Sequence, residues 1–310
     1  MSVTPNAPEL PQLAKPAQLL RCPAPAKINL FLHVVGRRAD GYHLLQSVFQ
    51  LIDLADYLDF EVLDSSQIMH RNPLPGVPAE SDLCIRAARL LQAQMQANGQ
   101  PLKGVAIRID KQIPMGGGLG GGSSDAATTL LALNYLWKIG LSRQDLMKIG
   151  LQLGADVPFF LFGANAFVEG IGEQMQAVAT RASHLVLIAP GVHVPTQIIF
   201  SAKDLTRNSK HVKIADFSSS ELSKESEFGK NDLQAVAENL FPPIQQAIQW
   251  LAQFGDARMT GSGSCVFCRF ASQAEADAVL EQVPENWKAW QATALELHPF
   301  AQLLEKKRNF

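Results

Sequence analysis

The amino-acid sequence predicts an α+β protein with two lobes that meet near residue 180. Short segments rich in β-branched and aromatic residues alternate with longer segments whose apolar residues recur at helical spacing. The 310 residues are enough for two ordinary domains with buried cores. After residue 180 the pattern changes, because the apolar strand LVLIAP is followed by a polar stretch over residues 201–231. We expect this stretch to be a long, partly mobile excursion.

Strands open the first lobe. The segment AKINLFLHVV, residues 26–35, has the composition of a buried strand, and a second strand is expected near residues 57–62. Between them, Asp40 and Gly41 form a strong turn dipeptide. The proline-rich residues 1–20 lack the cationic start and apolar core of a secretory signal, so we expect a flexible N-terminal extension.

Helices and a glycine-rich loop complete the first lobe. Asp82 is placed to cap an amphipathic helix that begins at Leu83. The strand VAIRIDKQI then leads into the loop PMGGGLGGGSSD, residues 114–125, which opens a second helix. Ser142 and Asp145 have the spacing of a capping box for a third helix.

The second lobe alternates helices and strands. We expect helices over residues 235–241 and 244–254, and a strand in the sequence CVFCRF. That strand contains Cys265 and Cys268 at C-x-x-C spacing, but no second pair of thiols and no nearby histidines follow to complete a zinc site. We therefore expect both thiols to act as small apolar side chains of a buried strand.

Charge and composition exclude several classes of function. The 27 basic and 29 acidic residues give a net charge of −2, which argues against a general nucleic-acid or anionic-membrane binder. The sequence has no run of about 18 apolar residues that would predict a membrane span. Its four cysteines are too few for a disulfide scaffold in a chain of this size. We therefore expect a cytoplasmic protein with reduced thiols.

The glycine-rich loop is the most distinctive feature of the sequence. Every residue from Gly116 to Gly122 is a glycine except Leu119. Residues without a Cβ let the backbone approach an anion closely, and the helix that follows adds free N–H groups and the positive end of its dipole. The loop is therefore predicted to hold phosphate, with the hydroxyls of Ser123 and Ser124 at its mouth; a flexible linker is the alternative.

Two familiar nucleotide-binding motifs do not fit this loop. A Walker A loop ends in Gly-Lys-Ser or Gly-Lys-Thr, and this loop contains no lysine. A dinucleotide-binding fingerprint needs an acidic residue about 20 positions further on, after a second strand. Here the chain continues as a helix into Trp137 and Lys138 instead.

Two charged residues are candidates for phosphoryl transfer to an alcohol. This reaction needs a carboxylate near the hydroxyl, and a cation or magnesium near the charge that spreads over the transferred group. Lys27 lies in an apolar strand, where an unpaired lysine is costly, and Asp156 lies in the apolar segment LGADVPFFLFG. The alternatives are a solvated amine at a strand end and a helix cap before Pro158. If the two pair, we expect the pKa of Lys27 to rise.

Together these segments resemble the GHMP family of small-molecule kinases, named for galactokinase, homoserine kinase, mevalonate kinase and phosphomevalonate kinase. The loop PMGGGLGGGSSDAA is similar to the family's phosphate loop, and MTGSGSCVF, residues 259–267, is similar to its late glycine-rich turn. The resemblance implies a two-lobed GHMP kinase fold. Its N-terminal nucleotide-binding domain, ribosomal-protein-S5-like, would span residues 21–178, and a ferredoxin-like α/β sandwich domain would span residues 179–310.

Within the family, PAKINLFLHVVGRRADGYHLLQSVFQ, GADVPFF, EGIGE and PGVHVPT resemble the branch that phosphorylates a cytidylated polyol. The resemblance implies ATP-dependent phosphorylation of the 2-hydroxyl of 4-diphosphocytidyl-2-C-methyl-D-erythritol, in the non-mevalonate route to isoprenoid precursors. These two small molecules would be the partners, with no nucleic acid or membrane, and the protein would be a monomer or a weak homodimer. Two rivals remain: a GHMP kinase for another alcohol, of the homoserine or mevalonate type, and a catalytically silent nucleotide-binding sensor.

The resemblance also implies roles for individual residues on the ATP side. Asp156 would be the catalytic base and Lys27 its partner. Mg²⁺ is expected with ATP, and Ser124 and Asp125 are candidate ligands, although substrate phosphates and water are expected to supply most of the ligand shell. The residues expected to bind ATP are Asp82, Leu83, Lys111, Pro114, Met115, Gly116, Gly117, Gly118, Leu119, Gly120, Gly121, Gly122, Ser123 and Ser124.

On the acceptor side the resemblance implies a cytosine site. Tyr42 and His43 would hold the base by stacking and hydrogen bonding, and Phe200 would complete an aromatic sandwich. Ordinary packing is the alternative for Tyr42, and a surface position is the alternative for His43. The other residues expected to contact the acceptor are Asn29, Phe49, Asp156, Ile171 and Thr196.

Overall fold

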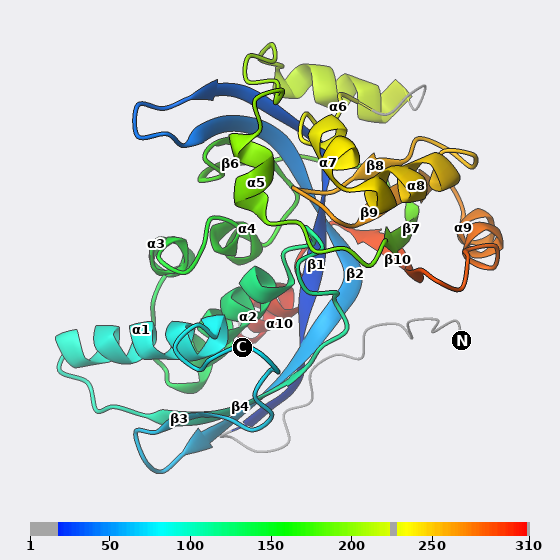
Figure 1. Cartoon of the computed structure of the whole chain (residues 1–310). Helices are drawn as coiled ribbons and strands as arrows, with labels where there is room; N and C mark the ends of the chain where they lie inside the picture. Colours follow the sequence, from blue (N-terminus) through cyan, green and yellow to red (C-terminus); the bar gives the residue numbers. More distant parts are fainter. Residues whose placement is uncertain (1–17, 224–227, 309–310) are drawn as a thin grey trace.

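A computed structural model describes residues 18–223 and 228–308, which form two lobes of mixed helix and sheet (Figure 1). The predicted two-lobed α+β architecture is confirmed. The predicted extension over residues 1–20 lies outside the described residues up to residue 17, and its last three residues already belong to the first strand. None of the helices in the described part is long and apolar enough to cross a lipid bilayer.

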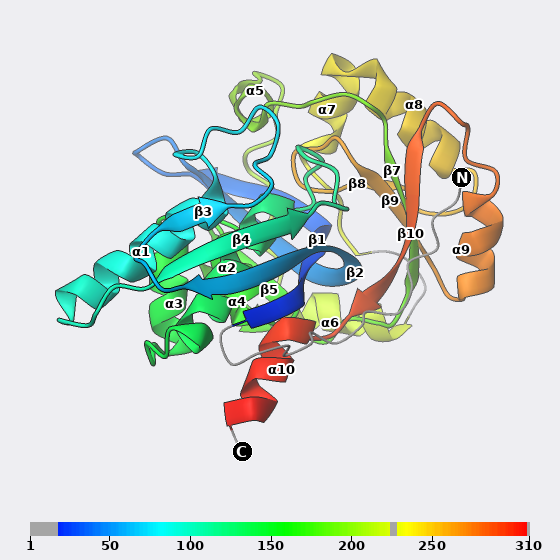
Figure 2. The ribbon, with the colours of Figure 1, turned by 90° about the horizontal axis from the view of Figure 1, so that it is seen from below.

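The strands of the described residues form one ten-stranded sheet that runs through both lobes. These strands are β1 (Gln18–Arg37), β2 (His43–Leu63), β3 (Ile68–His70), β4 (Gly104–Asp110), β5 (Ala166–Gly170), β6 (Gln174–Ala177), β7 (His184–Ala189), β8 (Arg258–Met259), β9 (Val266–Phe270) and β10 (Lys288–Leu295). The long strand β2 pairs antiparallel with β1, β4, β5 and β10. β10 pairs first with β7 and then, through Ala294 and Leu295, with β2, so it joins the sheets of the two lobes (Figure 2).

Helices begin where the sequence provides polar caps. The described helices are α1 (Leu83–Ala97), α2 (Gly121–Leu136), α3 (Arg143–Leu151), α4 (Val157–Phe162), α5 (Thr196–Ser201), α6 (Ile214–Ser223), α7 (Gln234–Leu240), α8 (Pro242–Leu251), α9 (Gln273–Leu280) and α10 (Pro299–Arg308). The carboxylate of Asp82 accepts hydrogen bonds from two N–H groups of α1, and the hydroxyl of Ser142 accepts one from an N–H of α3. The predicted cap at Asp82 is therefore confirmed. At α3 the cap by Ser142 is present, but the Asp145 carboxylate accepts a hydrogen bond from the Ser142 hydroxyl instead of the reciprocal backbone bond of the predicted capping box.

Each lobe has its own apolar core. In the first lobe, Leu91, Leu130 and Phe159 of α1, α2 and α4 are buried in one cluster with residues of β1, β2 and β4. Phe300 of α10 is fully buried in this same core, so the end of the chain returns to the first lobe (Figure 2). In the second lobe, residues of α7, α8 and α9 pack with β7 and β9. A domain boundary between residues 178 and 179 stays a prediction.

Two predictions about the second half of the chain have different outcomes. Cys265 and Cys268 are both fully buried, as expected. The polar stretch over residues 201–231, where it is described, is more ordered than predicted, because it contains α6 and the fully buried Phe217. The ring centroid of Phe217 lies 6.2 Å from that of Phe31 on β1. The prediction of a loose excursion is wrong here, because apolar side chains spaced among the polar residues, Phe217 and Ile214 of α6 among them, pack into the core.

The glycine-rich loop is tied to both lobes through its backbone carbonyl groups. The Leu119 carbonyl accepts a hydrogen bond from the N–H of Lys27 on β1 at 3.0 Å. The Gly117 carbonyl accepts one from the N–H of Cys265, next to β9, at 3.1 Å. The loop is therefore fixed between the first strand of the first lobe and the late glycine-rich turn of the second.

This packing requires glycine at position 118. Gly118 has a φ of +76°, and a Cβ added there would lie 2.3 Å from the carbonyl oxygen of Thr260. The Gly118 carbonyl in turn lies 3.4 Å from the hydroxyl of Thr260, which can donate to it. The loop and the late turn fit together because the loop has no side chain at this contact.

Gly118→Ala is expected to destabilise the fold by at least about 1–3 kcal/mol, the cost of left-handed backbone at a residue other than glycine, and the clash with Thr260 adds to it. Gly122→Ala is the matched control, because a Cβ there would meet only Leu83 at 3.6 Å. In the first turn of α2, alanine is expected to leave stability unchanged or to raise it by up to about 1 kcal/mol. Urea unfolding measures both variants, and equal stabilities would contradict the tight fit of the loop.

Candidate active site

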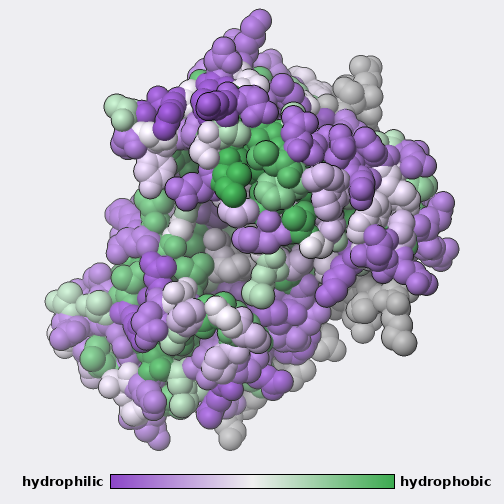
Figure 3. Space-filling model, viewed as in Figure 1, coloured by the Kyte–Doolittle hydropathy of each residue, from purple (hydrophilic) through white to green (hydrophobic). Residues whose placement is uncertain are grey.

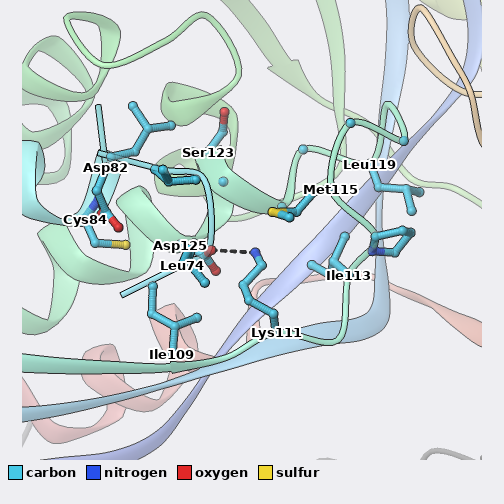
Figure 4. Close-up of a pocket in the computed structure, with 18 of the residues that line it drawn as sticks. Leu74, Asp82, Cys84, Ile109, Lys111, Ile113, Met115, Leu119, Ser123 and Asp125 are labelled. Atoms are coloured by element: carbon cyan, nitrogen blue, oxygen red, sulfur yellow. Dashed lines mark hydrogen bonds and ion pairs between the residues drawn. The ribbon is translucent and has the colours of Figure 1, made fainter. Parts of the chain in front are cut away.

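The first of two adjoining cavities lies over the start of α2 and has a volume of about 370 Å³. Apolar side chains such as Leu74 and Ile109 contribute to its walls, and Lys111 and Asp125 line it with their charged groups (Figure 4). The glycine loop forms another wall. The cavity thus combines apolar surface, charge and bare backbone, which suits a nucleotide.

The glycine loop carries backbone N–H groups that the protein does not use. Within the described residues, none of the N–H groups of residues 116–123 has a hydrogen-bond acceptor. Gly116, Gly118 and Gly120 have φ values of +70°, +76° and +74°. Alternation of left-handed residues turns successive N–H groups toward one side and creates a concave site for anions. The positive end of the α2 dipole adds to this attraction.

Lys111 is held by two carboxylates beside the same cavity. Its ammonium pairs with Asp56. It also pairs with Asp125 at 2.7 Å, a contact that Figure 4 marks with a dashed line. Burial alone would lower the pKa of Lys111, but the two carboxylates outweigh burial and raise that pKa above its usual value. Burial, and then the charge of Asp56, raises the pKa of Asp125 well above its usual range. An ammonium has three donors, so two of them serve the structure before any ligand binds.

The second cavity is larger, about 980 Å³. The molecular surface is hollowed between the two lobes (Figure 3). Gly116, Gly118 and Gly120 line both cavities, so the glycine loop is the wall between them. Because this wall has no side chains at those positions, ligands on its two sides can approach each other closely. The second cavity also contains the charged pair Lys27 and Asp156.

Lys27 and Asp156 face each other across a short distance. The Lys27 ammonium lies 3.7 Å from Oδ2 of Asp156 and donates a hydrogen bond to Oδ1 of Asn29 at 2.8 Å. The Asn29 amide is oriented by a hydrogen bond that its Nδ2 donates to the hydroxyl of Ser47 at 2.9 Å. Asp156 occupies the N-cap position of α4 but makes no capping hydrogen bond, so the helix-cap alternative is wrong. Its side chain is 35% exposed, which leaves the carboxylate accessible to a ligand.

The predicted rise in the pKa of Lys27 is wrong. Burial lowers the pKa of Lys27, and the nearby Asp156 charge offsets only part of that effect. The Lys27 side chain is only 4% exposed, which also excludes the alternative of a solvated amine. The ring of Phe49, whose centroid lies 5.0 Å from the ammonium, provides a cation–π contact in place of water.

In the second cavity, the rings of His43 and Phe200 lie too close together to hold a base between them. The ring centroids of His43 and Phe200 lie 5.0 Å apart, with the ring planes inclined by 33°. A base stacked between two rings needs about 7 Å, twice a contact distance of ~3.5 Å, so His43 and Phe200 cannot enclose one between them. Tyr42 lines the same cavity and is 63% exposed. The aromatic sandwich of Tyr42 and Phe200 stays a prediction.

Comparison with known proteins identifies the family. Residues 82–164 match the model of the GHMP kinases N terminal domain, and residues 218–289 match that of the GHMP kinases C terminal domain. The proteins named 4-diphosphocytidyl-2-C-methyl-D-erythritol kinase from Herminiimonas arsenicoxydans and Janthinobacterium sp. (strain Marseille) are 65% and 64% identical to this chain. Each alignment covers 92% of this chain and 98% of the relative. This chain belongs to the GHMP kinase family.

A solved structure supports the same assignment. The crystal structure of a 4-(cytidine 5'-diphospho)-2C-methyl-D-erythritol kinase superimposes with a TM-score of 0.75 at 33% sequence identity. The match covers 89% of this chain and 98% of the other. The resemblance to the GHMP family that the sequence motifs indicated is therefore confirmed, and so is the branch within it.

Nearly all the residues predicted for this kinase site lie in the expected cavity. The first cavity is lined by Asp82, Leu83, Lys111, Pro114, Met115, Gly116, Gly117, Gly118, Leu119, Gly120, Gly121, Gly122 and Ser123. The second is lined by Lys27, Asn29, Tyr42, His43, Phe49, Asp156, Ile171, Thr196 and Phe200. Ser124 is the exception: it is fully buried and lines neither cavity, so its predicted place at the mouth is wrong. α2 has already begun at Gly121, and position 124 is turned into the protein interior.

Magnesium has few candidate ligands here. Within the described ranges, no three His, Cys, Asp or Glu side chains converge to hold a metal ion. Oδ1 of Asp125 is buried without a hydrogen-bond partner, and Asp125 lines the first cavity. The hydroxyl of Ser124 also lacks a partner but does not reach the cavity. One carboxylate fits a magnesium ion that is carried mainly by substrate phosphates and water.

Asp56 was missed by the sequence prediction. Its carboxylate accepts hydrogen bonds from the N–H groups of residues 112 and 113 and pairs with Lys111, so it fixes the strand that leads to the glycine loop. The pattern of β2 contains the clue, because Asp56 alternates along the strand with the buried Leu58 and Phe60. A carboxylate at such a position must be paired or hydrogen-bonded.

Thr260 was missed as well. Its hydroxyl oxygen accepts a hydrogen bond from the backbone N–H of Asn29 at 3.1 Å. The same hydroxyl can donate a hydrogen bond to the Gly118 carbonyl. Thr260 therefore connects the charged pair to the glycine loop. The motif MTGSGSC indicated the turn, but no sequence spacing specified a partner 231 positions away.

Lys111→Met is expected to lower the free energy of unfolding by about 3–5 kcal/mol, because it leaves two carboxylates together without a cation. The loss should shrink as the pH falls. Because the pKa of Asp125 is raised in the folded state, its carboxylate takes up a proton more readily there than in the unfolded state. Acid therefore stabilises the folded variant, since a protonated carboxyl tolerates burial. Urea unfolding at neutral and mildly acidic pH measures the effect.

Lys148→Met is the matched control for this experiment. Lys148 also pairs with an aspartate, but its side chain is 77% exposed. Its removal is expected to leave the free energy of unfolding within experimental error. The structural role of Lys111 would be contradicted if Lys111→Met lowered the free energy of unfolding as little as the control does. A loss that does not change with pH would contradict it as well.

Proposed function

We propose that this protein transfers the γ-phosphoryl group of ATP to the 2-hydroxyl of 4-diphosphocytidyl-2-C-methyl-D-erythritol. The observation that carries the proposal is the glycine wall shared by two cavities. On one side it offers free N–H groups, and on the other it adjoins Lys27 and Asp156. Membership of the kinase family supplies the identity of both substrates, since relatives 65% and 64% identical bear that enzyme's name.

ATP is expected to occupy the first cavity with its phosphates along the glycine loop. The unpartnered N–H groups of residues 116–123 suit the negatively charged phosphate oxygens. The apolar side chains of Leu74, Leu83 and Ile109 suit the adenine ring. Magnesium, when bound with ATP, would neutralise part of the charge on the transferred group, and Asp125, whose Oδ1 lacks a hydrogen-bond partner, would be its candidate protein ligand.

Asp156 and Lys27 are expected to act on the acceptor hydroxyl. The exposed carboxylate of Asp156 can accept a hydrogen bond from the hydroxyl, orient it toward the γ-phosphate and take its proton late in the transfer. The buried ammonium of Lys27 stabilises the negative charge of Asp156 and of the transferred group. Asn29 keeps that ammonium in place by accepting its hydrogen bond.

The second cavity suits a large, partly aromatic acceptor. Its volume of about 980 Å³ is at the upper end of the range for small-molecule sites, as expected for a diphosphate that joins a nucleoside to a polyol. Tyr42, His43 and Phe200 provide aromatic surface for a base. Homoserine or mevalonate has no base, so these side chains would be left without a partner by such an acceptor.

A catalytically silent nucleotide sensor is the remaining alternative. The contact between Lys27 and Asp156 disfavours it, because a sensor has no need of a costly buried ammonium beside an accessible carboxylate. Release of ADP in a coupled assay with the cytidylated acceptor, with homoserine or with mevalonate separates all three alternatives. The cytoplasmic location and a monomeric or weakly dimeric state stay predictions.

Asp156→Asn is expected to lower kcat by about 10²–10⁴-fold, because the amide cannot accept the proton of the acceptor hydroxyl. The affinity for ATP should change little, since Asp156 does not line the first cavity. Steady-state kinetics and calorimetric titration with an ATP analogue measure the two quantities. Asp145→Asn, at an exposed aspartate of α3, is the control. A parallel loss of ATP affinity, or a kcat that is retained, would refute the assigned role.

A further inference from the structure

Arg207 connects the segment after α5 to the ring of His43. Its Nε donates a hydrogen bond to Nε2 of His43 at 3.2 Å. The terminal nitrogens of the guanidinium donate to the backbone carbonyls of Phe200, Ala202 and Leu205 at 3.1, 2.6 and 3.1 Å. The guanidinium is therefore fixed by the backbone, and its Nε–H donor orients the imidazole.

An arginine side chain can only donate hydrogen bonds, so it determines which nitrogen of His43 carries the proton. Nε2 must accept the bond from Arg207 and is therefore unprotonated. In a neutral imidazole the proton then resides on Nδ1. Burial, and then the charges of Arg207 and Arg37, lowers the pKa of His43, which favours the neutral ring. Among the described residues, Nδ1 of His43 has no hydrogen-bond partner.

We infer that Arg207 is a positioning residue that makes His43 an obligate N–H donor toward the base of the acceptor. The inference rests on the proposed function, because it assumes that His43 meets that base in the second cavity. Cytosine presents hydrogen-bond acceptors at N3 and O2, whereas uracil carries an N–H at position 3. A ring locked as a donor can pair with N3 of cytosine but would meet a second donor in uracil.

The guanidinium of Arg207 also positions Phe200, whose ring packs on the imidazole of His43. Arg207 holds the carbonyl of Phe200, and the Phe200 ring packs on His43 with centroids 5.0 Å apart. One residue therefore fixes both the proton of His43 and the plane in which the ring lies. The segment 201–231, for which the sequence alone suggested no function, thus contributes Arg207, which helps to select cytosine over uracil.

The test is the substitution Arg207→Gln, because a glutamine amide can donate or accept and no longer fixes the proton of His43. The KM for the cytidylated acceptor is expected to rise about tenfold, as for one lost hydrogen bond in a site, while kcat changes less. The preference for the cytidylated acceptor over its uridine analogue, as a ratio of kcat/KM values, should fall by about tenfold. Arg207→Lys retains an obligate donor and is expected to keep more of this preference.

A spectroscopic measurement separates positioning from general damage to the loop. In protein labelled with ¹⁵N in histidine, the imidazole shifts of His43 should show the proton on Nδ1 in the wild type and a mixture in Arg207→Gln. Arg71→Gln is the control: it removes an exposed guanidinium that pairs with Glu61, and should change neither the spectrum nor the preference.

Two outcomes would overturn the inference: a wild-type ring with its proton on Nε2, or an Arg207→Gln variant that discriminates between the two bases as the wild type does. The failure of the proposed function has a different signature. In that case the wild-type protein itself would show no turnover with the cytidylated acceptor, whatever the protonation of His43.

Discussion

The site depends on one arrangement of the backbone: the carbonyl groups of the glycine loop are used by the protein, and its N–H groups are not. Lys27, Thr260 and Cys265 supply donors for three successive carbonyls of the loop. The N–H groups of residues 116–123 are left without acceptors in the described chain. A backbone donor without a partner is unfavourable unless water or a ligand satisfies it. A phosphate chain can satisfy several of these donors at once, which makes the loop selective for polyanions.

This arrangement needs both lobes. The loop belongs to the first lobe, but two of the groups that hold it, Thr260 and Cys265, come from the late turn of the second. Thr260 also accepts the N–H of Asn29, which in turn holds the Lys27 ammonium. The shared strand β10 and the return of α10 to the first core keep the two lobes together. The donor cavity, the wall and the acceptor cavity are therefore parts of one connected framework.

The sequence predicted the features that depend on local pattern or on a specific motif. The cap at Asp82, the burial of Cys265 and Cys268, and the proximity of Lys27 and Asp156 all belong to this group. Local spacing predicts a helix cap. A charged residue inside an apolar segment predicts a partner of opposite charge, because an unpaired buried charge is unfavourable.

The features that the sequence did not predict depend on burial that only the assembled fold creates. Ser124 is turned inward by the helix that starts three residues earlier. The pKa of Lys27 is lowered because burial outweighs its ion pair, and the balance of these two opposed effects depends on the depth of the side chain. Arg207 reaches His43 across 164 positions of sequence, and no spacing rule connects such residues.

The most direct test of the account is a crystal structure with a non-hydrolysable ATP analogue and the cytidylated acceptor bound together. The account predicts that the β- and γ-phosphates accept hydrogen bonds from N–H groups of residues 116–123. It also predicts that the 2-hydroxyl of the acceptor lies about 2.6–3.2 Å from the carboxylate of Asp156, in line with the γ-phosphate. Phosphates bound away from the glycine loop, or an acceptor hydroxyl that points away from Asp156, would contradict it.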